Sequence, residues 1–228
     1  MANFLPAVIL PGYLADQADY LPLAKNLASL GVSGRVVPLR WWEWLPTVGG
    51  RSVVPILTRL AETIRAAKLQ YKCDRVNLIA HSAGGWIARI YLGDVPYYDR
   101  LWQGRSEVAC LVSLGTPQVS LEPWASKNLD FVNRNYPGAF YPELEYVCVA
   151  GKAVLGEKKL AKWLAYSSYE LTSGDGNCWG DGIIPIGAAH LEGANNLILA
   201  GAQHSPRSGL WYGSAALLSE WVKYLATS

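Results

Sequence analysis

Residues 76–92 read VNLIAHSAGGWIARIYL, and this stretch decides the fold. It starts with an apolar run typical of a strand buried on both faces of a sheet, and helical spacing of apolar residues follows from Trp86. Ser82 lies at the sharp turn between them, where a side chain projects from the carboxyl edge of the sheet. Small residues leave room for that turn, including Ala80 in place of the usual first glycine, and Gly84. We therefore expect Ser82 to be a nucleophile; the alternative is an ordinary serine in a glycine-rich turn.

The rest of the chain alternates strand and helix patterns. Apolar runs that end at Gly or Pro predict strands at residues 7–10, 34–39, 108–114, 146–150 and 196–201. Amphipathic spacing and sequence context predict helices at residues 20–27, 53–70 and 215–225. Such alternation indicates an α/β fold with a mostly parallel central sheet and helices on both faces.

The size and composition of the chain indicate one domain. It has 228 residues, of which 51% are hydrophobic and 17% charged, which excludes intrinsic disorder. We expect residues 1–228 to form a single domain. Residues 119–142 and 156–180 are expected to leave the sheet as cap or lid excursions.

Charge and hydropathy exclude several classes of protein. The net charge is +2 and no basic cluster is present, so we expect no nucleic-acid partner. Pro, Gly or a charge interrupts every apolar run before the roughly 18 residues of a membrane span. The first residues lack the positive segment of a signal peptide, so we expect a cytoplasmic or membrane-peripheral protein.

The cysteines do not form a metal-binding or redox motif. The four residues are Cys73, Cys110, Cys148 and Cys178, and no two are spaced as a CxxC pair. We therefore expect buried thiols and no metal. Cys110 and Cys148 fall in two consecutive predicted strands, and whether they pair is left open.

A serine nucleophile needs a base, and the sequence has three histidines. His81 belongs to the turn itself, and strand alternation directs it away from Ser82. We favour His204 because it directly follows the last predicted strand, at the same sheet edge. The alternative, His190, is expected in a surface loop.

The acid that orients the base is expected before His204 in the chain. Asp181 lies in the tight turn GDGIIP, residues 180–185, where two isoleucines would bury its carboxylate. Asp175, in another glycine-flanked turn, is the main alternative and is expected to be solvated.

Two backbone N–H groups are expected to form an oxyanion hole. One belongs to Ala83, at the start of the helix after Ser82, and the other to Tyr13, in the loop after the first strand. Gly12 lets the backbone approach the substrate, although a plain turn would also explain a Pro-Gly sequence.

Ten tryptophans are unusual in a chain of this length. Trp and Tyr suit half-wet surfaces, so we expect Trp41, Trp42, Trp124 and Tyr141 to contact acyl chains of a substrate or a membrane surface. Ordinary core packing is the alternative.

Together these motifs resemble the α/β-hydrolase superfamily, and within it lipase-like serine hydrolases, over nearly the whole chain. AHSAGG at 80–85 is similar to the elbow of small bacterial lipases, LGTP at 114–117 resembles a lipase strand end, and GDGIIP looks like the acid loop. WLPTVGG at 44–50, combined with this elbow, looks closest to lipase-like hydrolases of cyanobacteria and plastids. Pro11 departs from the pattern, because lipases usually carry a histidine there.

The resemblance implies hydrolysis of a carboxylic ester, without a cofactor. Ser82 would attack the carbonyl, His204 would move the proton, Asp181 would orient His204, and the N–H groups of Tyr13 and Ala83 would hold the oxyanion. We favour an acyl-lipid substrate and a peripheral contact with a membrane surface. A short-chain esterase, a thioesterase, an acyltransferase and a non-catalytic ligand-binding protein on the same scaffold stay open. Acyl length, head group, lid movement and oligomeric state are not predicted.

Overall fold

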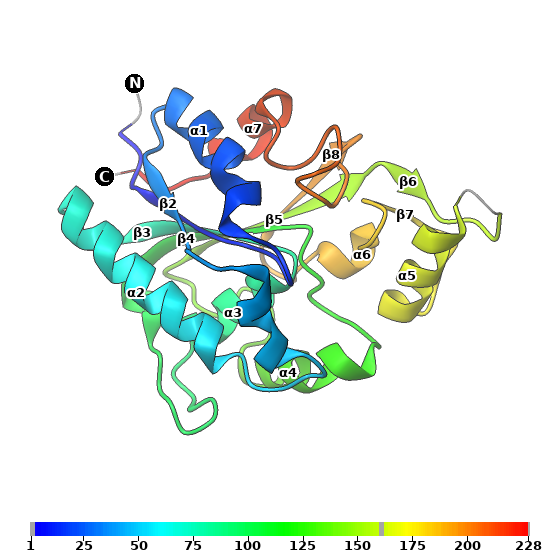
Figure 1. Ribbon diagram of the computed structural model, residues 1–228, viewed down its shortest axis with the longest axis horizontal. Helices are drawn as coiled ribbons and strands as arrows, with labels where there is room; N and C mark the ends of the chain where they lie inside the picture. Colours follow the sequence, from blue (N-terminus) through cyan, green and yellow to red (C-terminus); the bar gives the residue numbers. More distant parts are fainter. Residues whose placement is uncertain (1–2, 160–161, 228) are drawn as a thin grey trace.

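The computed structural model describes residues 3–159 and 162–227, without the side chains of residues 123–126. Its centre is a six-stranded sheet in which each pair of neighbouring strands is parallel, in the order β2-β1-β3-β4-β5-β8 (Figure 1). These strands are β1 (Ala7–Leu10), β2 (Gly34–Val36), β3 (Val76–His81), β4 (Val108–Leu114), β5 (Glu145–Lys152) and β8 (Asn195–Ala200). The predicted second strand is shorter than expected and ends before Pro38, which has no N–H for the ladder.

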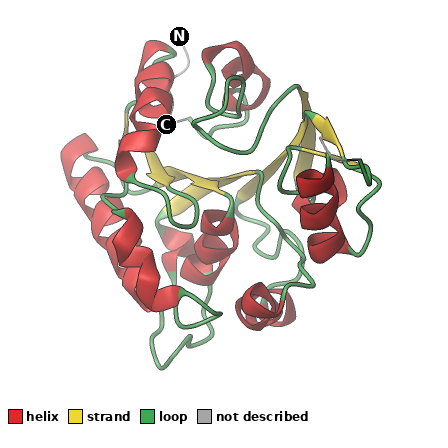
Figure 2. Cartoon of the chain, turned by 45° about the vertical axis from the view of Figure 1, so that its right-hand side comes forward, coloured by secondary structure: helices red, strands yellow, loops and turns green. Residues whose placement is uncertain are grey.

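Helices cover both faces of this sheet, as predicted (Figures 1 and 2). Helices α1 (Leu21–Ser29) and α7 (Ala215–Val222) pack on one face. Helices α2 (Val54–Tyr71), α3 (Ala83–Leu92) and α4 (Pro123–Asn135) pack on the other. Short 3₁₀ helices lie in the loops: η1 (Gln17–Tyr20), η2 (Trp41–Thr47) and η3 (Gly104–Ser106).

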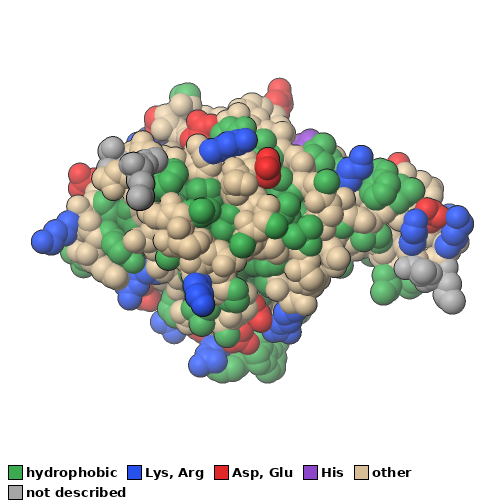
Figure 3. Space-filling model, turned by 90° about the horizontal axis from the view of Figure 1, so that it is seen from above, with side chains coloured by type: hydrophobic (Ala, Val, Ile, Leu, Met, Phe, Trp, Pro, Cys, Tyr) green, Lys and Arg blue, Asp and Glu red, His purple; other side chains and the backbone are tan. Residues whose placement is uncertain are grey.

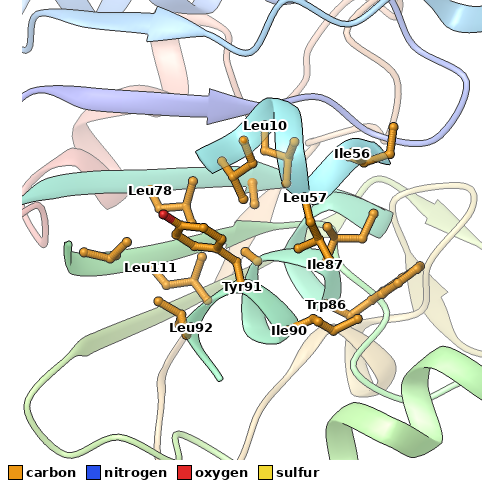
Figure 4. Close-up of a cluster of buried hydrophobic side chains, with 14 of the residues drawn as sticks. Leu10, Ile56, Leu57, Leu78, Trp86, Ile87, Ile90, Tyr91, Leu92 and Leu111 are labelled. Carbon is orange, nitrogen blue, oxygen red and sulfur yellow. The ribbon is translucent and has the colours of Figure 1, made fainter. Parts of the chain in front are cut away.

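The strands are buried on both faces because their side chains alternate between two apolar cores. In β1, Ala7 and Ile9 belong to the core under α1 and α7, whereas Val8 and Leu10 belong to the core under α2 and α3. Figure 4 shows the second core, in which α3 packs against β3 and β4. Every residue of α3 is buried, so the start of this helix is held firmly.

The two central cysteines lie on opposite faces of the sheet. Cys110 belongs to the core under α1 and α7, and Cys148 to the core under α2 and α3. Both thiols are free and buried, which answers the question of whether they pair.

The segment after β5 leaves the sheet at its carboxyl edge. It contains β6 (Val154–Leu155), α5 (Trp163–Ser173), β7 (Trp179–Gly180), which pairs antiparallel with β6, and α6 (Ile186–Ala189). Figure 3 shows the outer part of this segment projecting from the body of the molecule, with basic side chains near its tip. The other expected excursion holds α4, and Leu129 and Val132 of this helix are buried in the core.

The two ends of the described chain lie together at the amino edge of the sheet (Figure 1). The Leu5 N–H donates to the Ala226 carbonyl at 3.0 Å. The buried Asn77 amide of β3 donates to the carbonyls of both residues and accepts the Ala226 N–H at 2.9 Å. None of the helices in the described part combines the length and apolar character needed to cross a bilayer.

Candidate active site

Ser82 lies in the turn between β3 and α3, with a backbone conformation that L-residues rarely adopt. Its φ is +53° and its ψ is −129°. Hydrogen bonds hold this conformation: the Ser82 N–H donates to the Leu114 carbonyl at 2.9 Å, and the Ser82 carbonyl accepts the Thr116 hydroxyl at 2.8 Å. A strained residue that its surroundings hold in place is typical of a functional site.

Glycines allow two loops, those after β1 and β4, to approach this turn. A β-carbon on Gly85 would overlap the Thr116 side chain, and one on Gly84 would lie 3.0 Å from the Pro11 carbonyl oxygen. One on Gly12 would lie 2.8 Å from His81 Nδ1. The small residues expected around Ser82 therefore serve close packing.

The structure brings Ser82, His204 and Asp181 into one hydrogen-bonded chain. His204 follows β8, and its Nε2 lies 3.1 Å from the Ser82 hydroxyl. Its ring Nδ1 lies 2.7 Å from Asp181 Oδ2, and its backbone N–H donates to the Asp181 carbonyl oxygen at 3.0 Å. Because an ionised carboxylate only accepts, Nδ1 carries the ring proton and Nε2 is free to accept the serine proton.

Asp181 is buried and surrounded by donors. Its Oδ1 accepts the N–H groups of Ile183 at 2.9 Å and Ile184 at 2.7 Å, and its Oδ2 accepts the Tyr212 hydroxyl at 2.6 Å. Burial works to raise the pKa of this carboxyl, but His204 and the donors outweigh it and hold the pKa below its ordinary value. Asp181 is therefore ionised at neutral pH.

The two alternatives lie elsewhere. Asp175 is exposed and accepts the Asn177 N–H at 2.8 Å, as a turn-forming aspartate does. His190 follows α6, and neither residue lines the cleft at Ser82. The fold thus brings to Ser82 the histidine and the aspartate that chain order predicts.

A cleft of about 190 Å³ opens at Ser82. Its lining includes Gly12, Tyr13 and Leu14 from the loop after β1, and His204 and Pro206 from the loop after β8. Tyr13 therefore lies at the cleft, as expected for an oxyanion-hole residue, and Ala83 begins α3 directly after Ser82. The positions of both residues fit the proposed pair of N–H donors.

The aromatic residues expected to bind substrate have different surroundings. Trp41 and Trp42, in η2, are about half exposed and do not line the cleft. Tyr141 does not line the cleft either, because its ring is buried in the core against Tyr136 and Phe140. The side chain of Trp124, in the first turn of α4, lies outside the described residues.

Polar residues that sequence reasoning missed complete the cleft. Asp19 and Arg207 form a two-pronged ion pair across it, with both N···O distances 2.9 Å. Tyr20 and His81 line its inner wall. Asp19 and Arg207 are 188 residues apart, so no local pattern connects them. Within the described residues, no group of three or more His, Cys, Asp or Glu is arranged to hold a metal ion.

Comparison with known proteins identifies the fold. No protein-family model and no curated protein matches the chain. A gene product of Listeria innocua superposes with a TM-score of 0.56 at 15% identity, covering 99% of this chain and 96% of that one. A protein described as a prospective cell surface hydrolase of Lactobacillus plantarum gives 0.56 at 11% identity, covering 100% and 95%. An alpha-beta serine hydrolase homologue of Coxiella burnetii gives 0.50 at 15% identity, covering 97% and 85%.

These similarities extend over nearly the whole chain, at identities that establish the fold alone. They agree with the parallel sheet, the helices on both faces and the strand, turn and helix around Ser82. The chain has the fold of the α/β-hydrolase superfamily.

Proposed function

We propose that this protein is a serine hydrolase that cleaves carboxylic esters. The observation that carries the proposal is the continuous chain from the Asp181 carboxylate through His204 to the Ser82 hydroxyl, at the sharp turn before α3. A serine hydroxyl alone is a poor nucleophile, and this arrangement supplies both the base and the group that orients it.

The reaction follows from the positions of the polar atoms. His204 Nε2 takes the Ser82 proton as the serine oxygen bonds to the ester carbonyl carbon. The N–H groups of Tyr13 and Ala83 bind the resulting oxyanion, and Asp181 stabilises the charged imidazole. The C–O bond to the alcohol then breaks, and the alcohol leaves with the proton from His204. Water attacks the acyl-enzyme by the same route and restores Ser82.

An acyl-lipid substrate is the form of this reaction that we favour. The cleft, at about 190 Å³, is smaller than the roughly 300–1,000 Å³ of most ligand pockets, so a long acyl chain would extend beyond it. The loop after β1 and η2 carry exposed apolar side chains that we define as the apolar patch: Leu14, Trp41, Trp42, Leu45 and Val48, each 44–50% exposed. Leu14 also lines the cleft, and the Trp44 N–H donates to the Ala15 carbonyl, so the patch adjoins the site.

The first experiment is labelling with a fluorophosphonate, read by mass spectrometry of the intact protein. We expect one adduct, and none in Ser82→Ala. Ser208→Ala is the matched control, since this serine is half-buried in the loop after β8, outside the cleft lining, and its loss should leave labelling intact. A folded wild-type protein that binds esters without an adduct would contradict the proposal and favour a ligand-binding protein.

A series of esters then tests the substrate class. Release of long-chain fatty acid from dispersed lipid would support the acyl-lipid form. Fast turnover of short soluble esters only would support a short-chain esterase. Comparing thioesters, and acceptor alcohols in place of water, separates the thioesterase and acyltransferase alternatives.

A further inference from the structure

His81 is a buried histidine that the proposed reaction does not use. It ends β3, next to Ser82, and its ring lies between Tyr20, from the loop after β1, and His204, from the loop after β8. Its Nδ1 lies 2.7 Å from the Tyr20 hydroxyl, and its Nε2 lies 2.9 Å from the carbonyl oxygen of His204. The ring therefore contacts the backbone of the residue that acts as the proposed base.

The partners fix the direction of every hydrogen bond in this connection. A carbonyl oxygen only accepts, so His81 Nε2 carries the proton and donates to His204. A neutral ring then accepts at Nδ1, so the Tyr20 hydroxyl donates to it. That hydroxyl in turn accepts the Gly12 N–H at 2.9 Å. One continuous series of hydrogen bonds therefore runs from Gly12 through Tyr20 and His81 to His204.

Burial keeps both side chains in these roles. Burial and the nearby His204 lower the pKa of His81 to about 3, so the ring is neutral at working pH. Burial also raises the pKa of the Tyr20 hydroxyl, which stays protonated and able to donate. The direction of these hydrogen bonds is therefore the same across the pH range in which a serine hydrolase works.

We propose that Tyr20 and His81 are positioning residues that hold the oxyanion loop, Gly12 and Tyr13, at a fixed distance from His204. The inference rests on the proposed ester hydrolysis. Ser82, the N–H of Tyr13 and the ring of His204 must converge on one carbonyl group, yet they come from three loops far apart in the chain. The hydrogen bonds of Tyr20 and His81 join the loop after β1 to the loop after β8. His81 itself is next to Ser82 in the chain.

The other connection between these loops is weaker. The Asp19–Arg207 pair also joins them, but the Arg207 side chain is 70% exposed, and exposed ion pairs contribute little. Tyr20 and His81 also contact Trp211 edge-on, with ring centroids 5.8 Å apart in both cases, so their rings have one packed position. The buried hydrogen bonds are thus the feature that sets the spacing.

Removal of one hydroxyl tests the proposal. Tyr20→Phe keeps the ring and deletes the link between Gly12 and His81. Tyr97→Phe is a matched control, because the buried Tyr97 hydroxyl also accepts one backbone N–H, from Val53, and donates to one side chain, Asn128, but lies outside the cleft. We expect the two variants to lose similar thermal stability.

Only Tyr20→Phe should slow the chemistry. We expect its rate of fluorophosphonate labelling and its kcat to fall about tenfold, with KM nearly unchanged, because one buried hydrogen bond that orients the reacting groups is lost. Tyr97→Phe should label at the wild-type rate. Labelling of Tyr20→Phe at the wild-type rate would overturn the inference.

A second set of variants tests His81 itself. In His81→Gln the side-chain amide can still donate toward the His204 carbonyl, whereas His81→Leu cannot, so Gln should retain clearly more labelling than Leu. Equal losses in folded His81→Gln and His81→Leu would overturn the positioning role and leave packing as the function of this ring. If wild-type protein is not labelled at Ser82, the proposed hydrolysis itself fails; if only the Tyr20 and His81 predictions fail, the hydrolysis stands.

Discussion

The cleft at Ser82 and the apolar patch share Leu14 but are built in opposite ways. At the cleft, Ser82 and His204 make defined hydrogen bonds, and the Asp181 carboxylate that accepts from His204 is buried. In the patch, five apolar side chains are each about half exposed. Reaction geometry needs fixed atoms, whereas contact with flexible acyl chains needs only exposed apolar area. We therefore expect mutations to separate the proposed chemistry from the proposed lipid contact.

The largest effect is expected for the buried acid that accepts from His204. Asp181→Asn should lower kcat about 10⁴-fold, because an amide no longer selects the His204 tautomer that accepts the serine proton. Ester hydrolysis under saturating substrate measures this. Asp175→Asn, in the exposed turn, is the control and should keep wild-type kcat; an equal loss in both variants would contradict the assignment of Asp181.

A pH titration of stability tests the buried histidine of the cleft wall. The unfolded chain protonates His81 near its ordinary pKa of 6.5, whereas the folded protein does so only near pH 3. The unfolded state therefore binds more protons below about pH 6.5, and His81 should cost up to about 1.4 kcal/mol of stability per pH unit down to about pH 4.5. Asp181 adds its own loss only at lower pH, as the pH falls through its lowered folded-state pKa.

Urea unfolding midpoints measured between about pH 4.5 and pH 7 check this slope. The decline should be shallower in His81→Gln, which has no imidazole at this position. An identical slope in wild type and His81→Gln would mean that His81 is charged in the folded protein.

A smaller effect is expected from crowding the cleft. The β-carbon of Gly12→Ala would lie 2.8 Å from His81 Nδ1, so we expect a loss of about 1–3 kcal/mol in the free energy of unfolding. Gly187→Ala is the control, because its β-carbon would meet no described atom within 4 Å. Chemical denaturation of the two variants compares them. Equal stability would mean that the oxyanion loop can move away from His81.

The smallest effect on chemistry is expected in the patch. The double variant Trp41→Ser, Trp42→Ser should hydrolyse short soluble esters at the wild-type rate but adsorb about tenfold less to lipid vesicles, because it loses exposed apolar area. Leu69→Ser is the control, since this residue is 75% exposed at the far end of α2. Vesicle sedimentation measures adsorption, and unchanged adsorption of the double variant would remove the patch from the lipid contact.

The sequence predicted the fold and the hydrogen-bonded chain at Ser82 because both have local signals. Apolar runs identified the strands of the central sheet, and chain order with turn chemistry selected Asp181 and His204. Exposure has no such signal. Trp41 and Tyr141 were expected to act alike, yet one is half exposed and the other buried, because burial depends on distant segments.

The same reason explains why the wall of the cleft was missed. Strand alternation was used only to direct His81 away from Ser82, and the contact of its ring with the His204 backbone spans 123 residues. Tyr20 was assigned only to a helix pattern. Its hydrogen bonds to Gly12 and His81 depend on how β1 and β3 pair in the sheet.

The contact of Asn77 with both ends of the described chain bears on how the protein folds. This side chain, on the interior strand β3, forms hydrogen bonds with the backbone of Leu5 and Ala226. The bonds to Ala226 close a loop of 149 residues. Every strand pair of the central sheet is parallel and joins segments separated by a crossover. Non-local contacts of this kind slow folding, because the entropy of loop closure is lost before the contacts form. During synthesis, the Asn77 side chain cannot complete its hydrogen bonds until Ala226, 149 residues later, has emerged from the ribosome, so we expect this part of the fold to be completed only after that point.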